Sequence, residues 1–226
     1  AIQAEDKAGQ VPIKDIEKLA NIEARLGERQ AAAAAYGTPE QAAGEALIRL
    51  ALRRLDGLDA LVSARAGDPD GTASLVNVER HALRGSAWKR LAGVHAKRML
   101  SGALDAEAQL KSGEAMQKAL VASVEAYGKA EGNPGSSQFS PYLALNRLAL
   151  DALTPWDDAG EHEAAMALAR QCQQLTTQAG ADFWAAVMPP EALLIERLLD
   201  GTLAATGDEG RSEERRVGKE CRLTCR

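Results

Sequence analysis

The chain has 226 residues, of which 46% are hydrophobic and 26% are charged. This length suits one large domain or two small ones, and the composition excludes disorder over the whole chain. No apolar run reaches the roughly 18 residues that a membrane-spanning helix needs, and no secretory signal pattern opens the chain, so a cytoplasmic protein is expected. The formal net charge is −5, from 27 Lys and Arg against 32 Asp and Glu.

Both ends of the chain are expected to lie outside the folded part. Residues 1–10 are predicted to be the disordered end of a fragment, 11–200 a helical repeat domain, and 201–226 a disordered tail. Residues 211–222 resemble a translated sequencing adapter, so 211–226 are interpreted as an artefact. Without 211–226 the chain has 21 basic and 29 acidic residues, a net charge of −8, and of its three cysteines only Cys172 remains. A lone cysteine suits a reducing compartment.

The composition predicts an all-α protein. Ala and Leu dominate the sequence, aromatic residues make up only 4%, and no sustained alternation of apolar and polar residues occurs. Ala and Leu favour helices, whereas strands favour β-branched and aromatic residues. Helix breakers then divide the chain into about seven helices.

In chain order, the first helix is expected over 12–26. Gly27 would close it, and its apolar stripe would consist of Ile13, Ile16, Leu19, Ala20 and Leu26. Thr38 would cap the second helix. The segment 101–113 is compatible with either a loop or an extra helical turn, and Pro189-Pro190 should kink or restart the last helix. The remaining predicted ranges are 38–64, 74–100, 114–130, 140–153, 161–179 and 182–199.

Helices of this length, joined by short loops, form either a closed bundle or an α-solenoid. Two segments approximate the halves of a tetratricopeptide (TPR) repeat. The spacing of Leu83, Gly85 and Trp88 resembles its first helix, and that of Ser123, Tyr127 and Ala130 resembles its second. These segments favour a TPR-like solenoid of antiparallel helix pairs, although they lie further apart than a standard repeat allows.

Taken together, five segments resemble a known group: the divergent TPR-like helical region of large bacterial proteins that carry a caspase-like CHAT protease or another effector domain. They are also similar to the TRAF-binding region of certain MAP kinase kinase kinases. The segments are Ile16-x-x-Leu19-Ala20-Asn21-x-x-Ala24-Arg25, Glu79-Arg80-x-x-Leu83-x-Gly85-Ser86-Ala87-Trp88-Lys89-Arg90, Tyr127-x-Lys129-Ala130, Tyr142-x-x-x-Asn146 and Asp182-Phe183-Trp184. The resemblance implies a non-enzymatic interaction or sensing module of a larger intracellular protein. Its partner would be a CHAT-type or other effector domain. Pro189-Pro190 departs from the pattern, and nothing matches the protease dyad.

The candidate binding residues come from the third and fifth predicted helices. The third carries six basic residues against Glu79 alone, in an otherwise acidic chain. Two interpretations stay open: a solvated face paired with acidic neighbours, or a basic groove for a protein or an acidic peptide. Nucleic acid is disfavoured because the acidic body would repel phosphates. The candidates are Arg80, Arg84, Trp88, Lys89, Tyr142 and Asn146.

No motif in the chain predicts catalysis, a metal or a cofactor. Glu161-His162-Glu163 lacks a second histidine one helical turn away, and acidic residues are favourable in the first turn of a helix. His81 and His95 flank Trp88 on one stripe of the third predicted helix but lie too far apart to share a metal. The stripe is interpreted as a partly buried seam, with a Trp-centred groove as the functional alternative. Cys172 has no neighbour that would lower its thiol pKa. The alternative to the interaction module is a self-contained helical-bundle enzyme or small-ligand-binding domain.

Overall fold

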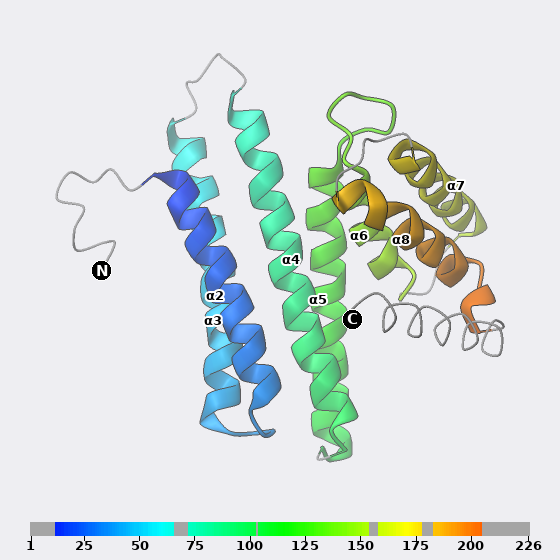
Figure 1. Ribbon diagram of the computed structural model, residues 1–226. Coiled ribbons are helices and arrows are strands. Elements are labelled where there is room, and N and C mark those ends of the chain that lie inside the picture. The colour runs from blue at the N-terminus through cyan, green and yellow to red at the C-terminus, as the bar shows by residue number, and fades with distance from the viewer. Residues whose placement is uncertain (1–11, 66–71, 103, 154–157, 178–182, 205–226) are drawn as a thin grey trace, which may run out of the picture. The chain divides into compact units, whose positions relative to one another are not determined.

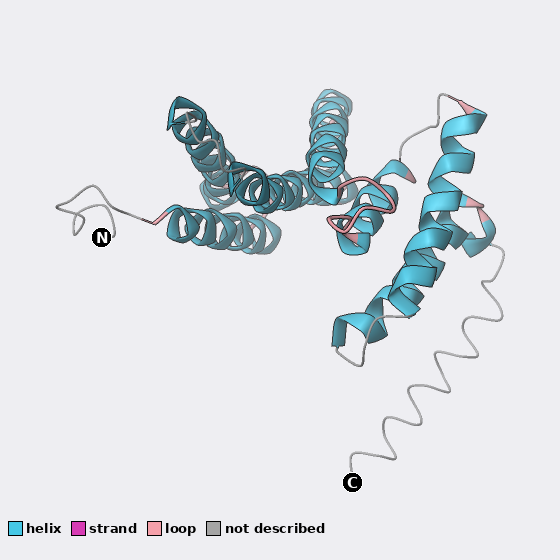
Figure 2. Ribbon diagram, turned by 90° about the horizontal axis from the view of Figure 1, so that it is seen from above, coloured by secondary structure: helices cyan, strands magenta, loops and turns pink. Residues whose placement is uncertain are grey.

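The computed structural model describes residues 12–65, 72–102, 104–153, 158–177 and 183–204. Its described residues form seven α-helices and one short 3₁₀ turn, and they contain no strand (Figures 1 and 2). The all-α prediction of about seven helices is therefore confirmed. The predicted disordered segments lie largely outside the described residues. None of the described helices has an apolar stretch that could span a bilayer.

The chain divides into two compact units, Ala1–Leu143 and Ala144–Arg226. The first unit contains α2 (Ile13–Ala33), α3 (Pro39–Arg65), α4 (Thr72–Leu100) and α5 (Ala106–Glu131). Helix α6 (Pro141–Asp151) crosses the division. The second unit contains α7 (Ala159–Thr177), α8 (Phe183–Leu199) and the 3₁₀ turn Thr202–Ala204.

In the first unit, α2 lies beside α3 and α4 lies beside α5 (Figure 1). Helix α4 also contacts both α2 and α3, which joins the two pairs through one core. Small residues line these contacts: Ala20, Ala24, Ala51, Ala87 and Ala126 are all at least 96% buried. Alanine has no side chain beyond Cβ, so the helix backbones can approach closely.

The prediction that Gly27 ends the first helix is wrong, because α2 continues six residues beyond it to Ala33. Gly27 is buried in the middle of α2, where it faces Gly44 of α3. A Cβ added to Gly44 would lie 2.5 Å from the backbone N of Ala31 and 2.6 Å from the carbonyl O of Gly27. Glycine is used here because the two backbones are in contact. A glycine in a helical pattern indicates a helix end when no packing partner is known, whereas Gly27 is a packing residue inside α2.

The apolar stripe predicted for this helix is also partly wrong. Leu26 is 54% exposed, and the buried seam consists of Glu17, Ala20, Ala24, Gly27 and Ala31. The seam keeps helical spacing but is made of small residues and one carboxylate. Apolar size therefore did not identify the buried face.

Local signals set several helix boundaries. The Thr38 hydroxyl accepts a hydrogen bond from Gln41 N at 3.4 Å, which confirms its predicted capping role. The ambiguous segment 101–113 contains a turn at Gly102 and then the start of α5, where the Asp105 carboxylate accepts a hydrogen bond from Ala108 N at 2.8 Å. These side chains satisfy backbone N–H groups that have no partner inside the helix.

In the second unit, α7 packs against α8. Of the kink or restart predicted at Pro189-Pro190, the restart is wrong, because α8 runs as one helix through both prolines, and the kink stays a prediction. Leu145, Leu148, Cys172 and Ile195 are among the residues buried in this unit. Burial of α8 residues against their neighbours outweighs the backbone hydrogen bonds that two prolines remove.

Candidate functional site

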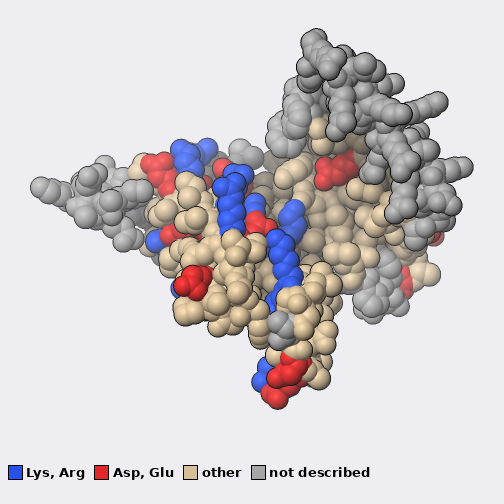
Figure 3. All heavy atoms as spheres, turned by 60° about the horizontal axis from the view of Figure 1, so that its bottom comes forward, with Lys and Arg blue, Asp and Glu red and all other residues tan. Residues whose placement is uncertain are grey.

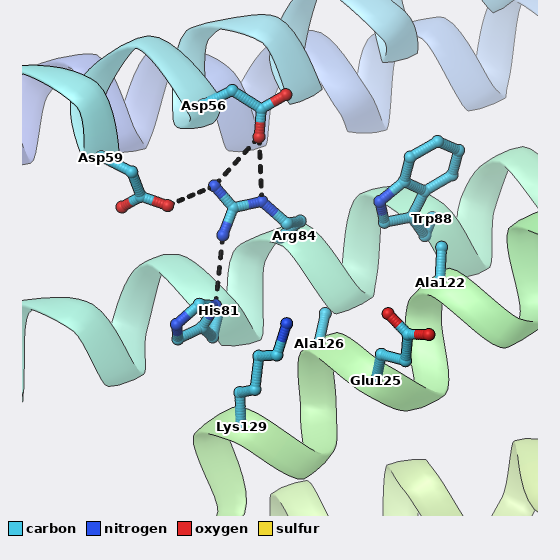
Figure 4. Close-up of a pocket in the computed structure, with 9 residues that line it drawn as sticks. All are labelled: Asp56, Asp59, His81, Arg84, Trp88, Ala122, Glu125, Ala126 and Lys129. Atoms are coloured by element: carbon cyan, nitrogen blue, oxygen red, sulfur yellow. Dashed lines mark hydrogen bonds and ion pairs between the residues drawn. The ribbon is translucent and has the colours of Figure 1, made fainter.

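A cavity of about 330 Å³ lies in the first unit, on the side of α4 that is flanked by α3 and α5. We call it the α4 groove (Figure 4). Two of the predicted binding residues, Arg84 and Trp88, line it. The full set of lining residues is Asp56 and Asp59 from α3, His81, Arg84 and Trp88 from α4, and Ala122, Glu125, Ala126 and Lys129 from α5.

At one end of the α4 groove, the Arg84 guanidinium contacts three neighbouring side chains (Figure 4). Its Nη2 donates to Asp59 Oδ2 at 2.6 Å, and its Nε donates to Asp56 Oδ1 at 3.2 Å. Its Nη1 lies 3.1 Å from His81 Nδ1. Because a guanidinium only donates, His81 accepts at Nδ1 and is therefore neutral. Burial, and next the charge of Arg84, lower the pKa of His81, which agrees with this assignment.

Two charged residues of α5 also line the α4 groove, Glu125 on the Trp88 side and Lys129 on the His81 side (Figure 4). Glu125 and Lys129, one turn apart on α5, are both exposed and form no ion pair with any described residue. Trp88 is partly buried, and its indole N–H has no hydrogen-bond acceptor among the described residues. The α4 groove thus combines the ion pairs of Arg84, the aromatic surface of Trp88 with Glu125 on its side, and the charge of Lys129 beside His81.

The basic residues of α4 are mostly paired with acidic residues of the preceding two helices. Arg90 forms an ion pair with Glu28, and Arg98 pairs with Glu45 at 3.4 Å. On the face shown in Figure 3, basic and acidic side chains are interspersed. These ion pairs agree with the first of the two interpretations, a solvated face paired with acidic neighbours. Both partners of each pair lie in the first unit.

Arg80 is the most buried of the predicted binding residues, with 1% of its surface exposed. Its Nε lies 2.8 Å from Asp59 Oδ1, and its Nη1 lies 3.8 Å from Glu17 Oε1. The Asp59 contact is an ion pair without the alignment of a hydrogen bond, and Glu17 Oε1 accepts no hydrogen bond from any described group. Burial, and then the charge of Glu79, raise the pKa of Glu17, while Arg80 opposes that rise. Arg80 therefore joins α2, α3 and α4 from inside the unit.

Lys89 and the two TPR-like segments meet where α4 packs on α5. Lys89 Nζ lies 5.7 Å from the centre of the Tyr127 ring, within the range of a cation–π contact. A Cβ on Gly85 would lie 2.9 Å from that ring, so the glycine makes room for the tyrosine. Ser123 donates from its hydroxyl to the carbonyl O of Gly85 at 2.7 Å. Burial raises the pKa of Tyr127 to about 12.

Tyr142 and Asn146 lie one turn apart on α6 and do not line the α4 groove. Tyr142 is 43% exposed, whereas Asn146 is 7% exposed. The structure therefore brings together Arg84 and Trp88 among the six predicted residues, places Arg80 in the core and Lys89 on Tyr127, and leaves the two α6 residues elsewhere. Their roles in binding stay predictions.

Seven of the nine lining residues are not among the binding residues that the sequence predicts: Asp56, Asp59, His81, Ala122, Glu125, Ala126 and Lys129. Glu125 and Lys129 follow Glu-x-x-x-Lys spacing on a helix, a pattern that usually indicates a pair stabilising the helix itself. Asp56 and Asp59 become recognisable only once α3 is known to lie beside α4. No signal in the sequence separates these residues from ordinary surface charges.

The histidines and the cysteine of the described residues lie in separate environments. Within the described residues, no group of three His, Cys, Asp or Glu side chains could hold a metal ion. His162 Nε2 lies 2.7 Å from the carbonyl O of Leu199, to which it donates, so it satisfies the last turn of α8. Cys172 is fully buried.

No family model, no protein of curated function and no solved structure shows significant similarity to this chain.

Proposed function

We propose that this chain is a non-enzymatic protein-interaction module, in which TPR-like antiparallel helix pairs present the α4 groove to a segment of a partner protein. We further propose that it works in the cytoplasm as part of a larger effector protein. The observation that carries the proposal is the α4 groove itself, because it combines an accessible aromatic side chain with charges that have no partner in the described residues. Aromatic anchors beside polar groups are typical of protein interfaces.

The packing of the first unit supports the repeat-like part of this proposal. Helix α4 contacts both helices of the preceding pair, as the first helix of each new pair does when helical repeats extend one core. The contact of Gly85 with Tyr127 and the hydrogen bond from Ser123 occupy the positions that the TPR-like segments assign to close helix packing.

A second candidate, binding of a small ligand, is favoured by the cavity volume. About 330 Å³ lies at the lower end of the roughly 300–1,000 Å³ that is usual for small-molecule sites. The α4 groove is lined mainly by charged side chains, however, whereas small-molecule sites are lined mainly by apolar ones. The balance of lining residues favours a protein segment.

The test is a selection of random peptides, displayed on phage, against the immobilised full chain. Enriched peptides are then titrated in solution against the Ala122→Arg variant, whose long side chain fills the α4 groove. The matched control is Val121→Arg, since Val121 is the adjacent residue of α5, is 45% exposed and does not line the cavity.

We expect the selection to give peptides whose affinity is at least about tenfold lower for Ala122→Arg than for the wild-type chain, which is about 1.4 kcal/mol in binding free energy. Their affinity for Val121→Arg should stay within about twofold of the wild-type value. Peptides that bind both variants equally would overturn the proposal. Small ligands that bind the wild-type chain and not Ala122→Arg, with no peptide doing so, would favour the second candidate.

A further inference from the structure

The α4 groove has an uneven distribution of charge that points to the chemistry of its partner. At the Arg84 end, positive and negative side chains already satisfy one another. The charge of Lys129 acts at this same end, since it contributes to lowering the pKa of the neighbouring His81. The Arg84 end therefore offers one unpaired positive charge next to a neutral imidazole.

Around Trp88 the oxygens without a partner among the described residues belong to carboxylates. Asp56 on α3 and Glu125 on α5 lie on the two sides of the helix that carries Trp88 (Figure 4). Both contacts from Arg84 to Asp56 go to Oδ1, so Oδ2 has no partner among the described residues, and the Asp56 side chain is 67% exposed. Glu125 has no ion-pair partner at all within the described part of the chain.

We propose that the α4 groove recognises a basic side chain, Arg or Lys, of a partner protein, which stacks on the Trp88 indole with its positive charge between Asp56 and Glu125. This inference rests on the proposed interaction function and adds the chemical class of the partner. Tryptophan is the most favourable aromatic residue for a cation–π contact, and a guanidinium also stacks on its ring. Two carboxylates with free oxygens supply the counter-charge.

An acidic peptide is the opposite case. It would gain Lys129 but would place its carboxylates near Asp56 and Glu125, where like charges repel. Arg84 cannot compensate, because its guanidinium is already occupied by Asp56, Asp59 and His81. Four of the six basic side chains of α4 are thus paired with acidic residues inside the first unit.

The experiment titrates the full chain with four capped tetrapeptides: tetra-arginine, tetra-lysine, tetra-glutamate and tetra-serine. Acetylated and amidated ends remove the terminal charges. The readout is the indole N–H signal of Trp88 in a ¹H–¹⁵N correlation spectrum. It is distinguished from the other two of the three tryptophans by the Trp88→Phe variant.

We expect tetra-arginine to shift the Trp88 signal saturably, with tetra-lysine weaker, tetra-serine silent and tetra-glutamate silent. In Glu125→Gln, the tetra-arginine affinity should fall about three- to tenfold, because an exposed carboxylate beside a cation–π contact is removed. Glu125→Lys should go further and allow tetra-glutamate to bind. Since Glu125 has no ion pair among the described residues, neither variant removes a contact that stabilises the fold.

The matched control is Glu114→Gln, an exposed position of α5 outside the α4 groove, which should leave the affinity within about twofold. An equal loss in Glu114→Gln and Glu125→Gln would show general charge attraction and overturn the proposal. Tetra-glutamate binding to the wild-type chain would overturn it as well.

The result also separates this inference from the proposed function. One outcome is that the selected peptides lose affinity in Ala122→Arg although they contain no basic residue. That result would support the interaction module and contradict the proposed site for a basic side chain. If no peptide loses affinity in Ala122→Arg, both the interaction module and the site for a basic side chain are contradicted.

Discussion

Among individual residues, Arg80 shows how a charged side chain can belong to the core. Its side chain is 2% exposed and that of Glu17 is 3% exposed, and the two join α4 to α2 while Asp59 adds the connection to α3. Removing one partner of a buried ion pair leaves the other charge desolvated and unbalanced.

We expect Arg80→Met to lower the free energy of unfolding of the first unit by about 3–5 kcal/mol, measured by urea denaturation. The double variant Glu17→Gln/Arg80→Met should recover much of this loss, because Asp59 keeps its ion pair with Arg84. Arg49→Met is the control: Arg49 is 46% exposed, pairs with Glu45 one turn away, and should cost about 0.5 kcal/mol. A loss in Arg80→Met no larger than in Arg49→Met would contradict the buried-pair interpretation.

His95 is the second residue whose burial has a measurable consequence. It is 3% exposed, neither of its ring nitrogens has a hydrogen-bond partner among the described groups, and Glu45 Oε1 lies 4.0 Å from its Nε2. Burial lowers the pKa of His95 below its ordinary 6.5, while Glu45 opposes that shift. The folded state therefore favours the neutral ring.

Because the pKa of His95 is lower in the folded state than in the unfolded state, its contribution to stability is complete above pH 6.5. It is lost as the pH falls through the folded-state pKa. We expect the free energy of unfolding to decrease from pH 7 to pH 5, and His95→Leu to reduce that decrease. Urea denaturation at each pH measures both curves, and parallel curves for the two proteins would show that His95 is not the titrating group.

At the scale of helices, the α2–α3 contact depends on two glycines that meet backbone to backbone. A Cβ on Gly44 would lie 2.5 Å from Ala31 N, whereas one on Gly57 of the same helix would meet no atom within 4 Å. We expect Gly44→Ala to lower the free energy of unfolding by about 1–3 kcal/mol, because the backbones must separate. Gly57→Ala should be neutral or stabilising by up to about 1 kcal/mol, because alanine favours a helix. Thermal denaturation followed by circular dichroism compares the stability of the two variants. Equal changes in stability would contradict the backbone contact between α2 and α3.

Helix α8 tests the opposite situation, in which local preference opposes the fold. Pro190 is exposed inside the helix, where it donates no backbone hydrogen bond. We expect Pro190→Ala to raise the free energy of unfolding of the second unit by about 1–3 kcal/mol. Pro141 occupies the first position of α6, where proline is favourable, so Pro141→Ala should be neutral or destabilising. A destabilised Pro190→Ala protein would mean that the ring makes contacts worth more than the restored hydrogen bond.

At the scale of the whole molecule, each of the two units has its own buried residues, such as Ile48, Leu55 and Leu91 in the first and Leu148, Cys172 and Ile195 in the second. Units with separate cores can unfold in separate transitions. We expect Gly44→Ala to reduce amide hydrogen-exchange protection in α2–α5 and to leave α7 and α8 unchanged at low urea. Mass spectrometry of the exchanged peptides resolves the helices, and a simultaneous loss in α7 and α8 would show one cooperative unit.

The sequence by itself determined the helical class, the approximate number of helices and several of their ends, because helix preference, proline position and capping by Thr38 act within a few residues. Only the tertiary structure decided that Gly27 is a packing residue, that Arg80 is internal, and that Trp88 lines one cavity together with Asp56 and Glu125. The physical reason is the same in each case. The partners of these residues come from other helices, and ion pairs and close contacts depend on how helices pack, which local preferences do not specify.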